Sequence, residues 1–442
     1  MMTKRLKMVL MAGAVMLAGL IPAAAFADAA PVISKIDTGD TAWMLISTAL
    51  VMLMTPGLAL FYGGMVRKKN VLGTIMQSFI IVAVISVQWA LWGYTLSFGP
   101  DLGHIIGDLS WLGLNGVGLE PNPDYAATIP HQLFMVYQMM FAVITPALIT
   151  GAVAERFKFK TFLVFTILWA TFVYDPLAHW VWGVGGWIRN MGALDFAGGT
   201  VVHISSGIAA LAAALVVGKR KGYPRTAMPP HNLTMTVLGA ALLWFGWFGF
   251  NAGSAVTSGS LATSAFLVTH LATAAAAIGW IAVEWYKHGK PTMLGAASGA
   301  VAGLVAITPA SGFVTPMPAI LIGLVAGALC YTAVSLKPRF GYDDSLDVVG
   351  VHCVGGTFGA IATGLFATVA VNAAGANGLF YGNPALLGKQ VVAVLVSLTY
   401  SFVVSFILLK VLDKVMGLRV DEEEESVGLD QSQHGESVYI FE

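Results

Sequence analysis

Long apolar segments separated by short polar stretches recur along the chain and predict membrane-spanning helices. The hydrocarbon core of a bilayer is about 30 Å thick, and a helix needs about 20 apolar residues to cross it. Eleven segments meet this description: 43–66, 71–98, 131–154, 160–178, 198–218, 232–251, 261–285, 292–308, 316–336, 348–371 and 387–413. The pattern therefore predicts an all-α polytopic membrane protein with eleven transmembrane helices.

The N-terminus has the pattern of a secretory signal peptide. Basic residues at 4, 5 and 7 precede an apolar run at 8–20, which is followed by Ala25-Phe26-Ala27. We expect cleavage after Ala27, since the run is short for the alternative, an uncleaved span. The prediction is thus a signal peptide at 1–27, a transmembrane domain at 28–413 and a polar cytoplasmic tail at 414–442.

The charged residues agree with a membrane protein and predict its orientation. The sequence is 57% hydrophobic and only 10% charged, with a mean hydropathy of +0.78. Eleven crossings from an external start place seventeen of the 23 Lys and Arg residues on the cytoplasmic side, three outside and three in the signal peptide. This asymmetry predicts an N-out, C-in topology. The formal net charge of +0 gives no indication of a nucleic-acid partner.

Two distant segments share one spacing of aspartate and histidine. They are Asp195-Phe-Ala-Gly-Gly-Thr-Val-Val-His203 and Asp344-Ser-Leu-Asp-Val-Val-Gly-Val-His352. Each aspartate can cap a helix, and each histidine then lies roughly 12 Å inside it. The predicted topology runs the fifth span inward and the tenth outward. We therefore expect an inverted 5+5 repeat plus one span, with both imidazoles near the middle of the membrane.

The predicted spans contain almost no fixed charge, which limits the chemistry at mid-depth. Lys and Arg are absent from span interiors, and the acidic residues lie near span ends. A lone cation would lose several kcal/mol of solvation there, whereas two neutral imidazoles can share a hydrogen bond and pass a proton. We interpret His270 as a polar group bonded to a neighbouring helix. No metal cluster, phosphate loop or cofactor motif is found, so we expect no cofactor and no enzyme.

Aromatic residues gather near the predicted external ends of several spans. Trp180, Trp182 and Trp187 follow the fourth span, Phe141 lies in the third, and the sixth ends in an aromatic run, Trp244, Trp247, Phe248 and Phe250, before Ser254. Core packing or an interfacial belt accounts for most such residues. The functional interpretation is a cation–π cup, worth roughly 0.5–2 kcal/mol per ring, with Ser254 as a hydrogen-bond acceptor.

Five segments together resemble the ammonium transporters of the Amt/Mep/Rh family, and the chain is similar to the bacterial Amt type over nearly its whole mature length. They are Pro56-Gly-Leu-Ala-Leu-Phe-Tyr-Gly-Gly64, Ala154-Glu-Arg156, Asp195 to His203, Gly246-Trp-Phe-Gly-Phe-Asn-Ala-Gly-Ser254 and Asp343 to His352. The resemblance implies that Trp182, Phe141 and Ser254 form an external ammonium site. It also implies that Phe141 and Phe250 form a gate below this site, and that Asp195 holds the site in place.

The resemblance further implies a narrow apolar pore lined by His203, His352 and Trp247. It implies a homotrimer in the cell inner membrane, with a possible PII-type nitrogen regulatory protein binding the cytoplasmic tail after Gly417. Our hypothesis is that ammonium is held outside, loses its proton and crosses as ammonia. The alternatives are an ammonium sensor signalling through the tail, a membrane haem protein with the two histidines as ligands, and a channel for water or small neutral solutes.

Overall fold

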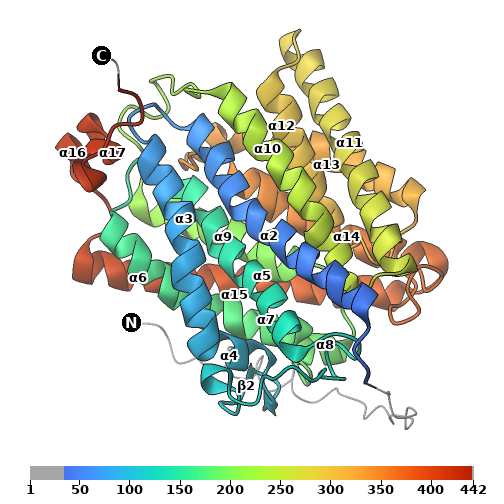
Figure 1. Cartoon of the computed structure of the whole chain (residues 1–442). Helices are drawn as coiled ribbons and strands as arrows, with labels where there is room; N and C mark the ends of the chain where they lie inside the picture. Colours follow the sequence, from blue (N-terminus) through green and yellow to red (C-terminus); the bar gives the residue numbers. More distant parts are fainter. Residues whose placement is uncertain (1–33, 441–442) are drawn as a thin grey trace, which may run out of the picture. The chain divides into compact units, whose positions relative to one another are not determined.

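The computed structural model describes residues 34–440, and this part of the chain is mostly helical (Figure 1). The predicted signal peptide at 1–27 lies outside the described residues. From Lys35 onward the chain forms one compact unit. The helices of the first half are α2 (Thr38–Met65), α3 (Val71–Gln88), α4 (Tyr94–Phe98), α5 (His131–Val153), α6 (Phe159–Trp169), α7 (Asp175–Trp182), α8 (Trp187–Met191) and α9 (Ser205–Val217).

The second half repeats the helical character and ends in two short tail helices. It contains α10 (Leu233–Trp247), α11 (Ser260–His288), α12 (Met293–Ile307), α13 (Pro316–Phe340), α14 (Val354–Phe366), α15 (Pro384–Met416), α16 (Glu422–Val427) and α17 (Leu429–His434). Three 3₁₀ turns are η2 (Leu112–Leu114), η6 (Gly253–Ala255) and η8 (Leu379–Tyr381). Strands β1 (Asp101–Leu102) and β2 (Ile106–Gly107) pair antiparallel in the loop after α4.

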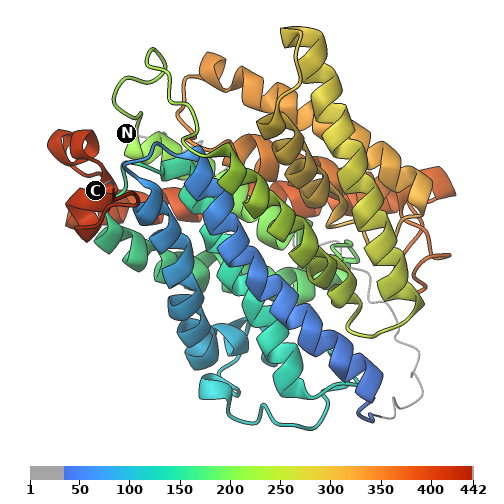
Figure 2. The same cartoon turned by 45° about the horizontal axis from the view of Figure 1, so that its top comes forward.

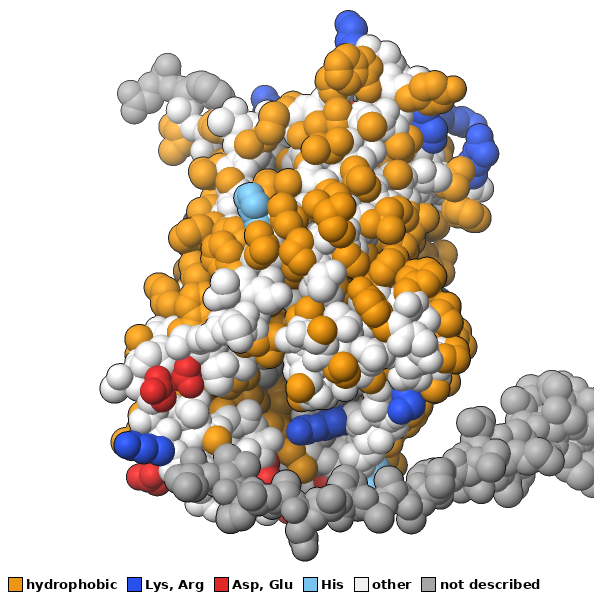
Figure 3. Space-filling model, turned by 90° about the vertical axis from the view of Figure 1, so that its right-hand side faces the viewer, with side chains coloured by type: hydrophobic (Ala, Val, Ile, Leu, Met, Phe, Trp, Pro, Cys, Tyr) orange, Lys and Arg blue, Asp and Glu red, His pale blue; other side chains and the backbone are white. Residues whose placement is uncertain are grey.

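Ten helical stretches among the described residues are long and apolar enough to cross a membrane. The segment predicted at 292–308 forms α12, a shorter apolar helix of 15 residues. The sequence pattern predicts that the fourth span ends at 178, but its helical stretch runs from Phe159 to Met191. Trp180, Trp182 and Trp187 therefore lie in α7 and α8 of this stretch, whereas the prediction placed them after the end of the fourth span. Figure 3 shows a broad apolar band on one face, with Lys and Arg toward both of its ends and Asp and Glu toward the lower end.

Five π-helical turns interrupt the long helices: η1 (Trp89–Gly93), η3 (Ala170–Tyr174), η4 (Gly199–Ile204), η5 (Phe248–Ala252) and η7 (Val349–Cys353). A π turn inserts one extra residue, so the side chains that follow it are rotated around the helix axis. Turns η4 and η7 carry His203 and His352, and each is followed by a helix of 13 residues, α9 or α14.

Glycines let the helices that carry the two histidines approach closely. A Cβ added at Gly207 of α9 would lie 2.2 Å from the backbone nitrogen of Cys353 in η7. A Cβ at Gly239 of α10 would lie 2.2 Å from the backbone nitrogen of Phe61 in α2. Real side chains cannot approach backbone atoms this closely, so glycine is required at both contacts. The contact at Gly207 sets the separation of the two histidine-bearing segments.

The tail helices α16 and α17 pack against the same end of the bundle as the starts of α3 and α6, as both views of the chain show (Figures 1 and 2). The backbone N–H of Gly73 in α3 donates to Asp430 Oδ1 at 2.8 Å, and the ring of His434 packs on Phe159 of α6 at 4.9 Å. We call the end of the bundle that contacts the tail the tail side.

Candidate functional site

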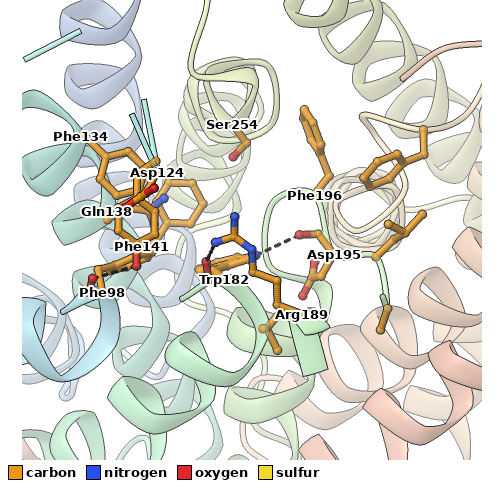
Figure 4. Close-up of a pocket in the computed structure, with 15 residues that line it drawn as sticks. Phe98, Asp124, Phe134, Gln138, Phe141, Trp182, Arg189, Asp195, Phe196 and Ser254 are labelled. Atoms are coloured by element: carbon orange, nitrogen blue, oxygen red, sulfur yellow. Dashed lines mark hydrogen bonds between the residues drawn. The ribbon is translucent and has the colours of Figure 1, made fainter. Parts of the chain in front are cut away.

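A hollow of about 260 Å³ opens at the end of the bundle opposite the tail, and we call it the vestibule. Phe141 of α5, Trp182 of α7 and Ser254 of η6 line it, so three elements far apart in sequence meet there (Figure 4). The ring of Phe141 meets the edge of Trp182 at 6.0 Å and 88°. These aromatic faces and the nearby hydroxyl form a suitable site for a small cation with N–H donors.

The Ser254 hydroxyl is held so that it can accept a hydrogen bond from a ligand. Its Oγ donates to the carbonyl of Phe250 at 2.8 Å, which uses its single hydrogen. Tyr137 lies 3.2 Å from the same Oγ, and its own hydroxyl donates to the carbonyls of Gly249 and Phe250 at 2.9 and 3.0 Å. Lone pairs of Ser254 thus remain available to a donor in the vestibule.

A pair of phenylalanines closes the inner end of the vestibule. The ring centroids of Phe141 and Phe250 lie 4.2 Å apart with an interplanar angle of 31°, and both residues are buried. On its other side Phe250 packs against Trp247 at 5.3 Å and His203 at 6.0 Å. Any solute leaving the vestibule toward the histidines must displace or rotate these two rings.

Beyond the phenylalanines, His203 and His352 lie in direct contact. Their Nδ1 atoms are 3.3 Å apart and their ring centroids 5.3 Å apart, and both residues are buried. A neutral imidazole has one N–H, so one Nδ1 donates and the other accepts. His203 Nε2 has no hydrogen-bond partner within the part of the chain that the structure describes. That nitrogen is available to a passing molecule.

Two small cavities flank the histidine pair and mark a narrow path. The first, about 10 Å³, is lined by Phe250, Trp247 and both histidines, and among the described residues no Lys, Arg, Asp or Glu lines it. The second, also about 10 Å³, continues from His352 toward Asp347 on the tail side. Each holds roughly one water-sized molecule. Trp247 presents its ring to His203 because its Nε1 donates to Thr308 Oγ1 at 2.9 Å.

Asp195 organises the start of η4 and the position of Trp182. Its carboxylate accepts the backbone N–H groups of Gly198, Gly199 and Thr200 at 2.8, 2.6 and 2.7 Å, and also the Thr200 hydroxyl. The Trp182 indole donates to the Asp195 carbonyl at 2.9 Å. Burial raises the pKa of Asp195, and the hydrogen bonds from residues 198–200 oppose this shift. The side chain therefore acts as a cap, and its oxygens face the backbone.

Asp344 has the matching place before η7 on the tail side. Its Oδ2 accepts the Val349 N–H at 2.7 Å, and the Lys337 ammonium donates to its carbonyl at 2.6 Å. Burial raises the pKa of Asp344 to about 6, while the charge of Lys337 opposes the shift. With this pKa the group changes its charge near pH 6.

The replacement Asp344→Asn should change how stability depends on pH. Because the folded-state pKa lies above the usual value, Asp344 contributes most to stability below about pH 4, and this contribution is lost as the pH rises through about 6. A tenfold change in a protonation equilibrium corresponds to about 1.4 kcal/mol. Thermal unfolding midpoints measured at pH 5 and pH 8 should show that the stability of the variant, relative to that of the wild-type chain, increases as the pH rises. A constant difference between the two chains would contradict this prediction.

Several aromatic residues expected near the vestibule lie elsewhere. Trp180 packs on Trp187 and on Tyr400, with centroids 5.9 and 4.5 Å away. Trp244 and Phe248 face the opposite side of α10 and η5, where Phe248 stacks on Phe266 at 3.8 Å. The helical period separates them from Trp247 and Ser254, which lie on the inner face.

The position of His270 also differs from the sequence prediction. The sequence interpretation bonds it to a neighbouring helix, but its side chain is exposed on the outer face of α11. Its ring lies 5.3 Å from Trp244, and no hydrogen bond joins it to any residue of the described chain. Its position on the outer face, away from the histidine pair, keeps it out of the pore path.

Sequence reasoning did not single out several polar residues in or beside the vestibule, among them Tyr137, which contacts Ser254 without lining the hollow itself. Tyr137 lies one helical turn before Phe141, and that spacing could have found it. Gln138 and Arg189 line the hollow (Figure 4), and Arg189 Nη1 donates to the Trp182 carbonyl at 2.6 Å. No sequence pattern marks these two. Gln138 lies in α5 and reaches the hollow through the packing of that helix, whereas Arg189 lies in α8, whose position depends on the path of the chain after α7.

Comparisons with known proteins agree with this geometry. The family model described as Ammonium Transporter Family matches residues 42–439. A relative named "Ammonium transporter" from Bacillus subtilis (strain 168) is 59% identical over 402 residues, which covers 91% of this chain and 98% of the relative. Saccharomyces cerevisiae Mep2 superposes with a TM-score of 0.83 at 36% identity over 89% of each chain. A structure titled "Sensor Amt Protein" gives a TM-score of 0.82 at 30% identity, covering 90% of this chain and 98% of that one.

Proposed function

The chain belongs to the ammonium transporter family, and on this premise we propose that it takes up ammonium and conducts it as ammonia. The observation that carries the proposal is the path itself. A hydroxyl and aromatic rings line the vestibule, two stacked phenylalanines close it, and beyond them two imidazoles touch in a cavity that no charged side chain of the described residues lines. The vestibule therefore suits a cation, and the cavity beyond the phenylalanines suits a neutral molecule.

Ammonium is held in the vestibule by the faces of Phe141 and Trp182 and by the lone pairs of Ser254. Its charge is stabilised there by the rings, whereas the first pore cavity offers no counter-charge. Transfer of one proton from ammonium to solvent water in the vestibule, at the phenylalanine gate, therefore lowers the barrier to entry. Ammonia then donates to or accepts from His203 Nε2 and passes along the imidazole pair. The contact of the two Nδ1 atoms at 3.3 Å also argues against the haem hypothesis, since an axial iron would have to lie between these rings.

The proposal extends to the location, membrane topology and assembly of the chain. The chain sits in the cell inner membrane after cleavage of the signal peptide, with eleven spans, N-out and C-in, as a homotrimer. The similar local structure of η4–α9 and η7–α14 supports an inverted repeat. A PII-type protein would bind at the tail side, where α16 and α17 lie. The charge distribution along the sequence supports this orientation.

Transport is tested by two measurements on the purified chain in vesicles. Labelled methylammonium uptake should occur, and ammonium should compete with it. An ammonium jump on a supported membrane at several pH values then reports charge movement. Uptake without current means that the neutral molecule crosses alone, and uptake with current means that the proton crosses as well. Absence of uptake at every pH would refute the proposal.

The replacement Ser254→Ala should weaken substrate binding while leaving the pore intact. A hydrogen bond to a charged group is worth about 1.5–3 kcal/mol, so the KM for ammonium should rise about tenfold or more. Ser335→Ala is a matched control, because Ser335 Oγ donates only within its own helix, to the Tyr331 carbonyl at 2.8 Å. An unchanged KM in Ser254→Ala would remove the hydroxyl from the binding site.

A sensor role is the second candidate, and the docked tail favours it. Glu425 of α16 is buried and pairs with Arg419 at 2.6 Å, while its other oxygen accepts the Lys221 N–H at 2.6 Å. The likeness to the solved structure titled "Sensor Amt Protein" also supports this second candidate. Removal of residues 421–442 would separate the two roles: a sensor loses its nitrogen response while flux persists.

A further inference from the structure

A second hollow of about 260 Å³ lies on the tail side, between the loop after α2 and the tail itself, and we call it the tail pocket. Lys68 and Lys69 contribute from the loop, and Asp430, Glu436 and Tyr439 contribute from the tail. It is as large as the vestibule and lies at the opposite end of the bundle. The transport path does not use it.

The walls of the tail pocket are built by hydrogen bonds between loop and tail. The Leu429 N–H donates to Asn70 Oδ1 at 2.8 Å, and the Asp430 N–H donates to the Lys69 carbonyl at 3.2 Å. Asp430 Oδ1 accepts the Gly73 N–H at 2.8 Å. The pocket therefore exists only while the tail is docked.

Asp430 has one carboxylate oxygen without a partner. The residue is 3% exposed, and its Oδ2 meets no hydrogen-bond donor from any described residue. A buried carboxylate oxygen with no donor costs free energy, so a donor from outside the chain is favoured there. Lys69 does not supply it: its Nζ donates to the carbonyls of Glu425 and Ser426 at 2.8 and 2.6 Å, and no hydrogen bond joins it to Asp430 Oδ2.

The charges around the pocket have both signs. Asp430 and Glu436 are acidic, and Lys68 and Lys69 are basic. Lys68 is exposed at the rim and is available to an anion. A ligand that carries an ammonium and a carboxylate a short distance apart would match the acidic and the basic side chains of the pocket.

We propose that the tail pocket binds a small zwitterion, a free α-amino acid. Its ammonium donates to Asp430 Oδ2, and its carboxylate contacts Lys68. Because the ligand touches both the loop and the tail, occupancy holds the tail in its docked position. The pocket is small and closed on one side by the tail, which favours a single amino acid over a peptide segment of a partner protein.

The proposal is tested on the purified full-length chain in detergent. Calorimetric titrations use glycine, L-alanine, L-glutamate and L-glutamine, with methylamine and acetate as probes of each half of the ligand. At least one amino acid should bind and should slow protease cleavage of residues 421–442. Methylamine and acetate should each bind at least about tenfold more weakly. No binding by any of the four amino acids overturns the proposal and leaves a water-filled pocket or a protein partner.

Asp430→Asn separates the ligand contact from tail docking. The asparagine Oδ1 can still accept the Gly73 N–H, while an amide NH₂ replaces the unpartnered oxygen. Amino-acid affinity should fall about tenfold or more, with the cleavage rate of the free tail unchanged. Glu423→Gln removes one charge from an exposed tail position outside the pocket and should leave affinity unchanged. Equal losses in both variants, or none in Asp430→Asn, would overturn the assignment.

Discussion

Replacement of both His203 and His352 by leucine is expected to reduce methylammonium uptake about hundredfold or more. Leucine keeps the size and apolarity of the site, but it removes the Nδ1 contact at 3.3 Å and the unpartnered Nε2 of His203. A desolvated ammonia molecule would then meet no hydrogen-bond partner between Phe250 and the tail side. A proton released at the gate would also lose its relay.

Uptake by vesicles over a range of ammonium concentrations provides the measurement. His270→Leu is the matched control, because it makes the same substitution at an exposed position outside the pore, and its uptake should equal that of the wild type. Single variants should retain more activity than the double variant, since one imidazole still offers a donor and an acceptor. Normal uptake by the double variant would exclude the histidines from conduction.

The second large effect is expected at Asp343, which anchors the tail side of the bundle. Asp343 Oδ2 accepts the backbone N–H and Nε of Arg220 at 2.8 and 3.0 Å, and Oδ1 accepts Nη2 at 2.9 Å. Burial raises its pKa, but the hydrogen bonds from Arg220 outweigh this and hold the pKa below its usual value. The carboxylate therefore stays ionised, and Asp343→Asn should cost about 3–5 kcal/mol by leaving a buried arginine without its full counter-charge.

Thermal unfolding in detergent at neutral pH measures this loss. Glu422→Gln removes a carboxylate from an exposed tail position and should leave the midpoint nearly unchanged. The double change Arg220→Met with Asp343→Leu should be less harmful than Asp343→Asn alone, because the buried guanidinium of Arg220 is removed together with its carboxylate partner. If the unfolding midpoint of Asp343→Asn equals that of the control, the Arg220–Asp343 pair contributes nothing to stability.

Much of the fold was predictable because hydrophobic runs of membrane length are strong signals. Nine of the predicted segments overlap a long apolar helix closely, and the fourth differs only in where it ends. The helical period also separates Trp247 and Ser254 from Trp244 and Phe248, although simple clustering along the sequence does not. The site residues were found through repeated spacing and family resemblance, and their placement around one path is consistent with the proposed roles.

The π turns and the charge network were not predictable from local sequence. A π turn depends on packing around the inserted residue, and Gly207 against Cys353 shows how close that packing is. Arg220 and Asp343 are 123 positions apart, and nothing in either segment identifies its partner. The prediction for His270 is wrong because a histidine within an apolar run can face inward or outward, and only tertiary structure distinguishes these cases.

The position of the tail has a consequence for the order of synthesis. Lys69, Lys221 and Arg419 all contact Glu425 or its neighbour Ser426, and Lys69 and Lys221 leave the ribosome long before residue 425 is made. Domains fold progressively as the chain emerges. The loops at this end of the bundle therefore stay without their acidic partner until residue 425 has been made. Synthesis of the tail is then the event that orders them, and a ribosome that stops before residue 425 yields a bundle whose tail-side loops lack these contacts.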